Sequence, residues 1–384
     1  MSLRIGVNAL YLLPGGVGGT EIYLRCLLGA LAAIDDTNEY FVFVNRETDD
    51  ALIPNAAKFH TVRCGVAATF RPGRIVYEQT VLCRMLRAHR IDVVFNPGYT
   101  SPLFAPCPTV SVFHDLQHKK HPEFFRYWDL PFWTFLLWLS ARFSTRLIAV
   151  SDATAADLVT WLPRVKSKVR VIPHGTDPEF FRIGKTRRAR PYILTASTLH
   201  PHKNVERLLE SFALFHRRHP EYRLIVAGLR GYAASKVEAR MVHLGLSDAV
   251  TLEGWVSRSK LYGLFESADA FIAPSLFEGF GMTVLEAMAA GLPLACSAIE
   301  PLQSLTGDVA HHFDPHSTEA MDAALERITQ DEDFRDRAAV AGPDRARGYS
   351  WERAAECTLQ ELVSAVDRRV SRNTPSSAPP PSAT

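Results

Sequence analysis

The chain has 384 residues, of which 47% are hydrophobic and 22% are charged, and its formal net charge is +2. This length suggests about two domains, and the composition is ordinary for a soluble globular enzyme. A net charge so close to zero gives no reason to expect a nucleic-acid-binding protein. The six cysteines form no Cys-x-x-Cys pair and lie mostly in apolar contexts, so we expect buried, reduced thiols and a cytoplasmic location rather than a disulfide framework.

The first half of the chain alternates short apolar segments with helical stretches, as is typical of a parallel α/β sheet. The first such segment begins almost at once, so we expect no signal peptide. The pattern predicts a Rossmann-like domain over residues 1–180. Its predicted strands are Arg4–Ala9, Tyr40–Asn45, Thr61–Val66, Val93–Pro97, Thr109–His114, Leu147–Ser151 and Val169–Pro173.

A glycine-rich segment, Pro14–Glu21, follows the first predicted strand and opens a helix. Its glycines allow the backbone to approach a ligand closely and leave N–H groups free. The spacing matches neither the Gly-x-Gly-x-x-Gly dinucleotide motif nor a P-loop, which needs a following Gly-Lys-Ser/Thr. A merely flexible loop is the alternative. The glycines predicted to border the ligand are Gly16, Gly18 and Gly19.

His114 stands at the carboxyl end of a predicted strand, where doubly wound folds place their ligands. Two further histidines, His118 and His121, follow in the next loop. We do not expect them to bind a metal, because no partner cluster is nearby and lysines adjoin them. They are expected to be solvated loop residues.

The most apolar stretch, Leu130–Phe143, is shorter than the ~20 residues that a membrane-spanning helix needs. We therefore expect a buried helix, and a helix on a membrane surface is the alternative. Five arginines of the first domain could form a basic face beside this aromatic region, although scattered solvated positions would explain them nearly as well. These arginines are Arg71, Arg74, Arg84, Arg87 and Arg90.

A basic segment without apolar periodicity, residues 181–190, is predicted to be a linker to a second Rossmann-like domain over 191–348. A last helix, 349–370, precedes a proline-rich tail, 371–384, that is expected to be disordered. We thus expect an α/β protein whose two doubly wound parallel-sheet domains hold their ligand in a central cleft. The strands predicted in the second domain are Tyr192–Ser197, Arg223–Ala227, Val250–Gly254, Ala270–Ala273 and Leu294–Ala298.

The loop after the first strand of the second domain contains Ser197, His202 and Lys203. The ammonium group of Lys203 is a suitable point charge for a diphosphate. An exposed lysine in an ordinary loop is the alternative interpretation.

The segment Ala270–Cys296 reads as a strand, a glycine-rich loop, a helix and a second strand. Free N–H groups at the start of the helix would make an anion site. Two carboxylates, Glu278 in the loop and Glu286 in the helix, can border the same pocket. Since carboxylates accept hydrogen bonds from hydroxyls, a nucleotide sugar fits this arrangement. The other residues predicted to bind this donor are Gly279, Phe280, Gly281, Met282 and Thr283.

The Glu-x7-Glu spacing, set in Ser-Leu-Phe-Glu-Gly-Phe-Gly, resembles the signature of the retaining GT-B glycosyltransferases of family 4. The resemblance implies a nucleotide sugar on the second domain, an acceptor entering across the first, and a last helix that crosses back to the first domain. It gives catalytic roles to His114 near the donor sugar, to Lys203 at the leaving diphosphate and to Glu278. It further implies that Glu278 holds sugar hydroxyls and Glu286 the ribose.

The sequence departs from the family pattern at several positions. Some members carry an arginine six residues before the lysine, where this chain has Ser197. Lys203 is therefore expected to provide more of the stabilisation of the diphosphate charge. His202 holds a position often occupied by arginine and is expected to compensate in part. His174 and Ser304 stand where Asn and Glu are usual, which bears on donor or acceptor preference.

We expect neither a metal ion nor another cofactor. The segment Asp331–Asp333 matches the Asp-x-Asp metal motif of the other large glycosyltransferase fold, but it lies in a charged, helical region with no strand before it. Lys203 and helix N-termini would stabilise the developing charge instead.

The motifs around Lys203 and His114 most resemble those of mannosyltransferases that extend bacterial surface polysaccharides such as lipopolysaccharide. The resemblance implies transfer of mannose from GDP-mannose to a glycan or lipid-linked acceptor, by a cytoplasmic protein that could contact the inner face of the membrane peripherally. A transferase using a UDP- or dTDP-sugar is a second hypothesis. A catalytically silent sugar-nucleotide-binding protein is a hypothesis of another class.

Overall fold

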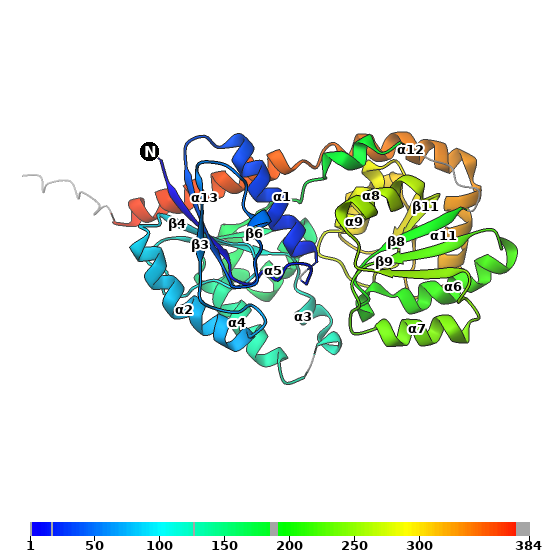
Figure 1. The fold of residues 1–384 in the computed structure, drawn as a ribbon, viewed down its shortest axis with the longest axis horizontal. Coiled ribbons are helices and arrows are strands. Elements are labelled where there is room, and N and C mark those ends of the chain that lie inside the picture. The colour runs from blue at the N-terminus through cyan, green and yellow to red at the C-terminus, as the bar shows by residue number, and fades with distance from the viewer. Residues whose placement is uncertain (1, 17, 126, 185–190, 374–384) are drawn as a thin grey trace, which may run out of the picture.

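The computed structural model describes residues 2–16, 18–125, 127–184 and 191–373. It contains two α/β domains, each with its own parallel sheet, so the predicted fold class is confirmed (Figure 1). Residues 185–190 of the predicted linker and 374–384 of the predicted tail lie outside the described part of the chain. The six cysteines lie among the described residues and form no disulfide with one another, and three of them are buried.

The first domain is built on a seven-stranded sheet with the strand order β3-β2-β1-β4-β5-β6-β7, in which neighbouring strands run parallel. Strands β4, β5 and β6 are buried along their whole length, as expected when helices cover both faces of a sheet. The strands are β1 Arg4–Ala9, β2 Glu39–Val44, β3 Phe59–Arg63, β4 Val93–Asn96, β5 Thr109–Phe113, β6 Arg146–Ala149 and β7 Val169–Val171. The helices are α1 Gly19–Ile34, α2 Arg71–Ala88, α3 Gln117–Lys120, α4 Leu130–Phe143 and α5 Asp152–Trp161, with the 3-10 segments η1 Asp50–Leu52, η2 Pro122–Phe124, η3 Pro163–Lys168 and η4 Pro178–Arg182.

The second domain has a six-stranded parallel sheet with the order β10-β9-β8-β11-β12-β13. The edge strand β13 was not predicted, because it is short and two of its three residues are histidines. The strands are β8 Tyr192–Ala196, β9 Arg223–Ala227, β10 Val250–Gly254, β11 Ala270–Ala273, β12 Leu294–Ser297 and β13 His311–Phe313. The helices are α6 Val205–Arg218, α7 Ala234–His243, α8 Arg258–Ser267, α9 Met282–Ala289, α10 Leu302–Thr306, α11 Thr318–Gln330 and α12 Glu332–Ala346, with η5 Pro201–Lys203 and η6 Gly307–Val309.

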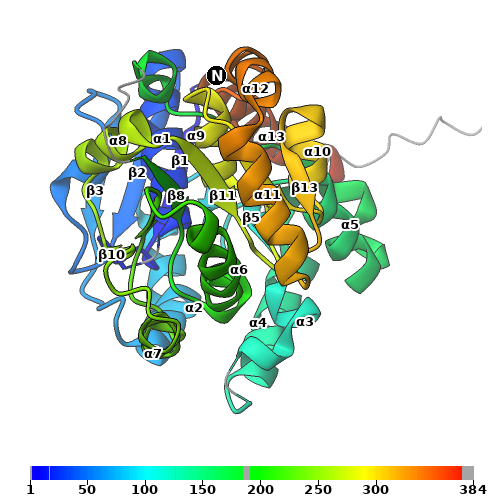
Figure 2. The same ribbon diagram turned by 90° about the vertical axis from the view of Figure 1, so that its right-hand side faces the viewer.

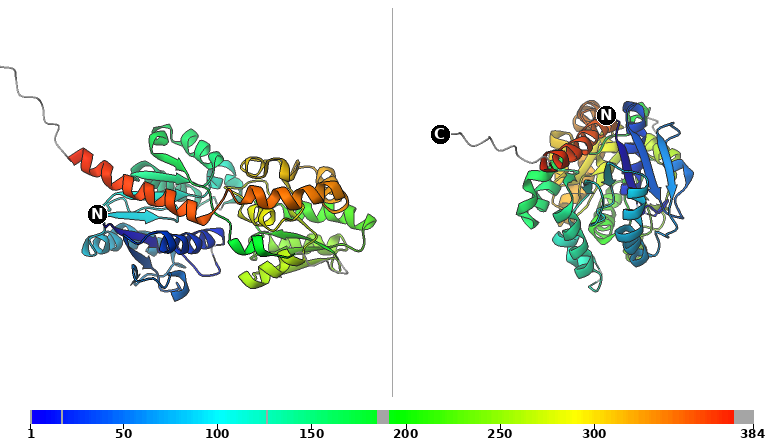
Figure 3. Two further views of the ribbon diagram at one scale, coloured as in Figure 1. Left: turned by 90° about the horizontal axis from the view of Figure 1, so that it is seen from above. Right: turned by 90° about the vertical axis from the view of Figure 1, so that its left-hand side faces the viewer.

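The last helix, α13 (Trp351–Asn373), leaves the second domain and packs against α1 of the first domain, as Figure 3 shows from above. Its Leu362 is fully buried in the same core as α1. Where the chain crosses between the domains, Thr176 pairs with Ser350 in a short bridge. A Cβ on Gly175 would lie 2.2 Å from the backbone nitrogen of Trp351, so only glycine allows the two crossing segments to approach this closely.

The expectation that the apolar stretch Leu130–Phe143 is a buried helix is wrong. One face of α4, with Leu137 and Ala141, packs into the first domain. The other face is open, and Phe132 and Phe135 are each 56% exposed. Figure 2 shows α3 and α4 projecting below the rest of the molecule. Among the described residues, no helix combines the length and the apolar character needed to cross a membrane.

The five arginines considered for a basic face do not share one environment. Arg71, Arg84, Arg87 and Arg90 are exposed. Arg74 is only 5% exposed, so it cannot be part of an exposed basic face. A basic face therefore contains four of these arginines at most.

Candidate functional site

The predicted residues Lys203 and Glu278 lie in contact at the carboxyl edge of the second sheet. Lys203 Nζ is 2.6 Å from Glu278 Oε1, although 75 residues separate the two in sequence. Ser275 Oγ donates a hydrogen bond to the same carboxylate oxygen at 2.7 Å. The Lys203 and Glu278 side chains are 18% and 17% exposed, so the pair is largely enclosed and still accessible to a ligand.

Hydrogen bonds between two loops hold this pair in place. Lys203 ends η5, and the following Asn204 has a φ of 57°, a left-handed conformation that asparagine tolerates. The Asn204 side-chain amide donates to the carbonyl of Pro274 at 3.1 Å. The Leu276 N–H donates to the carbonyl of His202 at 2.7 Å. The loop after β8 is thereby fixed to the loop after β11.

Helix α9 starts directly after this loop. Gly281 is its N-cap residue with a φ of 103°, and no side chain caps the helix. The first N–H groups of α9, at Met282 and Thr283, therefore remain available to an anion. Phe280 does not face this site with its side chain, because its ring is buried against His174 with a centroid distance of 4.8 Å.

The first domain reaches the same loop through His114, which follows β5. Its Nε2 is 2.8 Å from the carbonyl oxygen of Pro97, and since a carbonyl only accepts, Nε2 carries the proton. Burial lowers the pKa of His114 to about 4, so the ring is neutral at pH 7. Ser151 Oγ donates to the carbonyl of Gly279 at 2.7 Å. A Cβ on Gly279 would lie 1.9 Å from the His114 carbonyl oxygen, so the domains touch here.

His202 does not supply the positive charge that we expected of it. Burial, with Lys203 as the next cause, lowers its pKa to about 2, and its Nδ1 accepts a hydrogen bond from the Gln117 side chain at 2.7 Å. This bond is a second contact between the domains. Ser197 lies at the end of β8, where its N–H donates to the carbonyl of Ala227. Lys203 is thus the only one of the three predicted residues in this loop that carries a positive charge at pH 7.

Glu286 is the fifth of the eight residues of α9 and is 4% exposed. Its Oε1 accepts a hydrogen bond from Arg258 Nη1 at 2.9 Å, and Arg258 Nη2 lies 3.0 Å from Asp177 Oδ2. Burial raises the pKa of Glu286, whereas the Arg258 guanidinium lowers it. The sequence did not point to Arg258 or Asp177, since they lie 28 residues before and 109 residues before Glu286 and no local pattern pairs them.

The glycine-rich loop of the first domain faces these elements. A Cβ on Gly18 would lie 4.0 Å from Thr198 Oγ1, and one on Gly19 would lie 3.8 Å from Met282 Sδ. Gly18 has a φ of 59°, which favours glycine. Gly16 instead folds back onto the side chain of Leu13. A Cβ on Gly15 would lie 3.9 Å from Trp255 Nε1, so Gly15, Gly18 and Gly19 all lie close to the second domain, with Gly19 opposite the start of α9.

The residues considered for metal binding have other roles. His118 is buried with its ring against Trp161, so the expectation of a solvated residue is wrong for it. Asp331 accepts a hydrogen bond from the Phe334 N–H at 2.9 Å and so caps α12. Within the described residues, no group of three or more His, Cys, Asp or Glu side chains is arranged to hold a metal ion.

Two Rossmann-like domains that meet at the carboxyl ends of their parallel strands, with a lysine–glutamate pair at the junction, define a GT-B fold. The family models agree with this class. Residues 17–180 match the model described as Glycosyltransferase Family 4, and residues 176–345 match Glycosyl transferases group 1.

The curated relatives of this chain are transferases. The O-antigen chain mannosyltransferase B of Escherichia coli is 33% identical over 173 residues, which cover 44% of each chain. A D-inositol 3-phosphate glycosyltransferase of Arthrobacter is 29% identical, over 59% of this chain and 57% of its own. The chain thus matches about half the length of these relatives.

Solved structures show the same fold across the whole chain. The sucrose-phosphate synthase of Thermosynechococcus elongatus superimposes with a TM-score of 0.76 and 18% sequence identity, covering 97% of this chain and 100% of that one. Because the two family models together match residues 17–345, the chain belongs to the GT-B glycosyltransferases of family 4.

Proposed function

We propose that this protein is a retaining glycosyltransferase that moves mannose from GDP-mannose onto a glycan or lipid-linked acceptor in surface polysaccharide synthesis. The observation that carries the proposal is the contact between Lys203 and Glu278 beside the uncapped start of α9. The name of the Escherichia coli relative, a mannosyltransferase, supports the choice of mannose.

Each of these groups has a distinct part in the proposed reaction. The Lys203 ammonium and the first N–H groups of α9 bind the diphosphate and stabilise its charge as the sugar–phosphate bond breaks. Glu278, released from Lys203 when the diphosphate binds, accepts hydrogen bonds from sugar hydroxyls. The neutral ring of His114, whose Nε2–H is donated to Pro97, accepts a hydrogen bond from a sugar hydroxyl at Nδ1 without adding charge. Glu286 lies deeper and is assigned to the ribose.

A ligand screen followed by a turnover assay tests this function. Thermal unfolding is measured with GDP-, UDP- and dTDP-sugars, since a ligand at 100 times its dissociation constant adds about 2.7 kcal/mol of stability. Release of free GDP from GDP-mannose is then measured with a glycan acceptor. A stabilising nucleotide sugar that is never turned over with any acceptor would favour a non-catalytic binding protein. If only a UDP- or dTDP-sugar is turned over, that sugar nucleotide, and not GDP-mannose, is the donor.

Turnover is expected to survive EDTA. The predicted source of charge stabilisation is Lys203 with the start of α9, whereas Asp331, the first residue of the Asp-x-Asp segment, caps α12. The assay compares the initial rate before and after chelation, with a known metal-dependent transferase as the positive control. Activity that disappears with EDTA and returns with Mg²⁺ would contradict metal independence.

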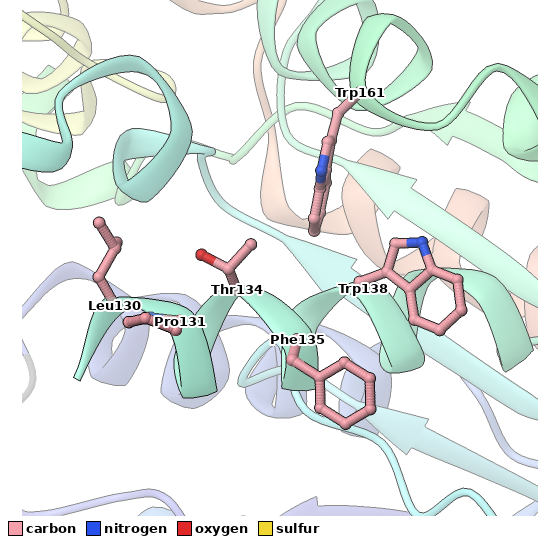
Figure 4. Close-up of a pocket in the computed structure, with 6 residues that line it drawn as sticks. All are labelled: Leu130, Pro131, Thr134, Phe135, Trp138 and Trp161. Atoms are coloured by element: carbon pink, nitrogen blue, oxygen red, sulfur yellow. The ribbon is translucent and has the colours of Figure 1, made fainter. Parts of the chain in front are cut away.

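We propose further that the protein meets its acceptor at the inner face of the cytoplasmic membrane through the exposed face of α4. This face carries Phe132 and Phe135, and Figure 4 shows the second of these beside an apolar hollow that Trp161 of α5 helps to line. The exposed Arg71 lies near it, with its guanidinium 5.9 Å from the Trp133 ring. Aromatic side chains with nearby cations are typical of surfaces that bind anionic membranes.

Flotation with liposomes tests this contact. Binding to anionic liposomes is expected at low salt, with a loss at high salt because each basic residue contributes about 1 kcal/mol that salt screens. The double substitution Phe132→Ser and Phe135→Ser should abolish flotation, and Val242→Ser, at an exposed apolar position of the second domain, should leave it unchanged. Equal and negligible flotation with anionic and neutral lipids at both salt concentrations would remove the membrane contact.

A further inference from the structure

Arg74, in the first turn of α2, is a buried cation with two guanidinium nitrogens that have no hydrogen-bond partner. Its side chain is 5% exposed, and its Nε and Nη1 atoms are buried without a hydrogen-bond partner. A guanidinium always carries its charge and has five N–H donors in a planar fork. Buried groups of this kind are normally paired, so two unsatisfied donors on one buried guanidinium call for an explanation.

The nearby carboxylate of Glu78 does not satisfy Arg74. Glu78 is 1% exposed, and its Oε2 accepts from Thr100 Oγ1 at 2.8 Å and from Asn8 Nδ2 at 3.1 Å. Its Oε1 accepts from the amide of Gln79 at 3.2 Å. Neutral side chains therefore occupy the Glu78 oxygens, and the charge of Glu78 acts on Arg74 only at longer range.

The position of Arg74 places it at the ligand-binding edge of the first sheet. Asn8 is on β1 and Thr100 follows β4, so Glu78 and Arg74 lie at the carboxyl ends of these neighbouring strands. Tyr11, directly after β1, lies within electrostatic range of Arg74 and donates a hydrogen bond to the carbonyl of Thr20 at 3.2 Å. The cluster is thus joined to the glycine-rich loop that faces α9.

The neighbourhood of Arg74 contains a further cation, Arg71. The start of α2 offers few backbone donors, because Pro72 has no N–H and the Arg74 N–H already donates to the carbonyl of Phe70 at 3.0 Å. Arg71, at the start of α2, is exposed and turns toward Trp133 of α4. A buried cation, a partly exposed phenol and an exposed cation therefore adjoin one another beside the proposed path of the acceptor.

We propose that Arg74, with the neighbouring Arg71, forms a subsite for a phosphate group of the acceptor. A planar guanidinium binds two phosphate oxygens at once, which fixes orientation as well as affinity. The assignment of this phosphate to the acceptor rests on the proposed function, whereas the anion site itself does not. The phosphate could belong to a sugar phosphate within a glycan or to the diphosphate that links a glycan to a lipid.

The first test measures inorganic phosphate binding by thermal unfolding at constant ionic strength. It uses the Lys203→Ala protein, which lacks the cation of the donor site. Arg74→Met in this background should weaken phosphate binding about tenfold or more, because a charge-assisted bidentate contact is lost. Glu78→Gln should tighten binding, since it removes the opposing charge. Arg84→Met, at an exposed position of the same helix, is the control and should bind as the parent does.

The outcomes separate this inference from the proposed function. The otherwise wild-type Arg74→Met protein should bind GDP as tightly as the wild type does. If neither protein binds GDP, the proposed GDP-mannose donor is wrong, and the phosphate subsite is not affected. Phosphate affinities that are equal in the Arg74→Met and Arg84→Met proteins would overturn the subsite. If the Arg74→Met protein does not fold, phosphate affinities that are unchanged in both the Glu78→Gln protein and the Arg71→Met protein would overturn the subsite instead.

A comparison of hexose phosphate with farnesyl diphosphate identifies the source of the phosphate. Preferential binding of hexose phosphate, sensitive to Arg74→Met, assigns the subsite to a glycan phosphate. Preferential binding of farnesyl diphosphate, sensitive to both Arg74→Met and the α4 substitutions, assigns it to a lipid-linked acceptor. In a turnover assay, Arg74→Met should raise KM for the phosphorylated acceptor about tenfold while KM for the donor stays the same.

Discussion

Replacing Lys203 by alanine is expected to lower kcat by roughly 10²-fold or more, by analogy with loss of one preorganised charge-stabilising group. Lys203 carries the charge of its loop alone, since Ser197 replaces the arginine of some relatives and His202 is neutral. The measurement is single-turnover release of the nucleoside diphosphate with saturating donor.

Lys260→Ala is the matched control for this substitution. Lys260 belongs to the same domain and also pairs with a glutamate, Glu253, but its side chain is 52% exposed. It should leave kcat unchanged. A Lys203→Ala protein within about threefold of the wild type would refute the role of Lys203 in stabilising the leaving group.

Replacing Gly279 by alanine is expected to reduce kcat/KM by about 10²-fold, because a small displacement of a catalytic group costs this much. The new Cβ would lie 1.9 Å from the backbone oxygen of His114, and a backbone atom cannot move aside cheaply. Either the loop that carries Glu278 shifts or the domains separate. In both cases Glu278 and His114 lose their common alignment on the sugar.

Gly263→Ala is the control, because a Cβ on Gly263 in α8 meets nothing within 4 Å. It should leave kcat/KM unchanged and raise the free energy of unfolding by about 0.5–1 kcal/mol, as expected for alanine in a helix interior. Small-angle scattering of the Gly279→Ala protein distinguishes a separation of the domains from a local shift of the loop. Wild-type kcat/KM for Gly279→Ala would show that this contact does not form during catalysis.

The parallel sheets could be predicted because their strands are apolar runs that are buried on both faces. Strand β11 begins and ends where Ala270–Ala273 was predicted, with Pro274 as its stop. The loop with Glu278 and the helix after it were predicted from glycine positions and helix propensity. Strand β13 was not predicted because its two histidines do not form a strand pattern. It is a strand because it pairs with β12.

Other features depend on contacts that a sequence pattern does not record. The apolar stretch of α4 is hydrophobic on all sides, so its composition could not show that one face is open. The pairing of Glu286 with Arg258 joins two helices that no motif connects. His202 was expected to be charged from its residue type, but its protonation depends on burial by both domains. From the sequence, Arg74 is predicted to be a surface residue of a basic helix, and only the contacts in the folded protein show that it is buried.

The return of α13 to the first domain also affects how the protein is made. The core around α1 includes Leu362, so the first domain to leave the ribosome lacks part of its interior until the second has been synthesised. Domains usually fold in the order of synthesis, whereas here the apolar side chains of α1 that α13 covers stay uncovered until α13 has been synthesised. Shortening the chain before Trp351 should therefore impair the half of the molecule that lies farthest from the cut in sequence.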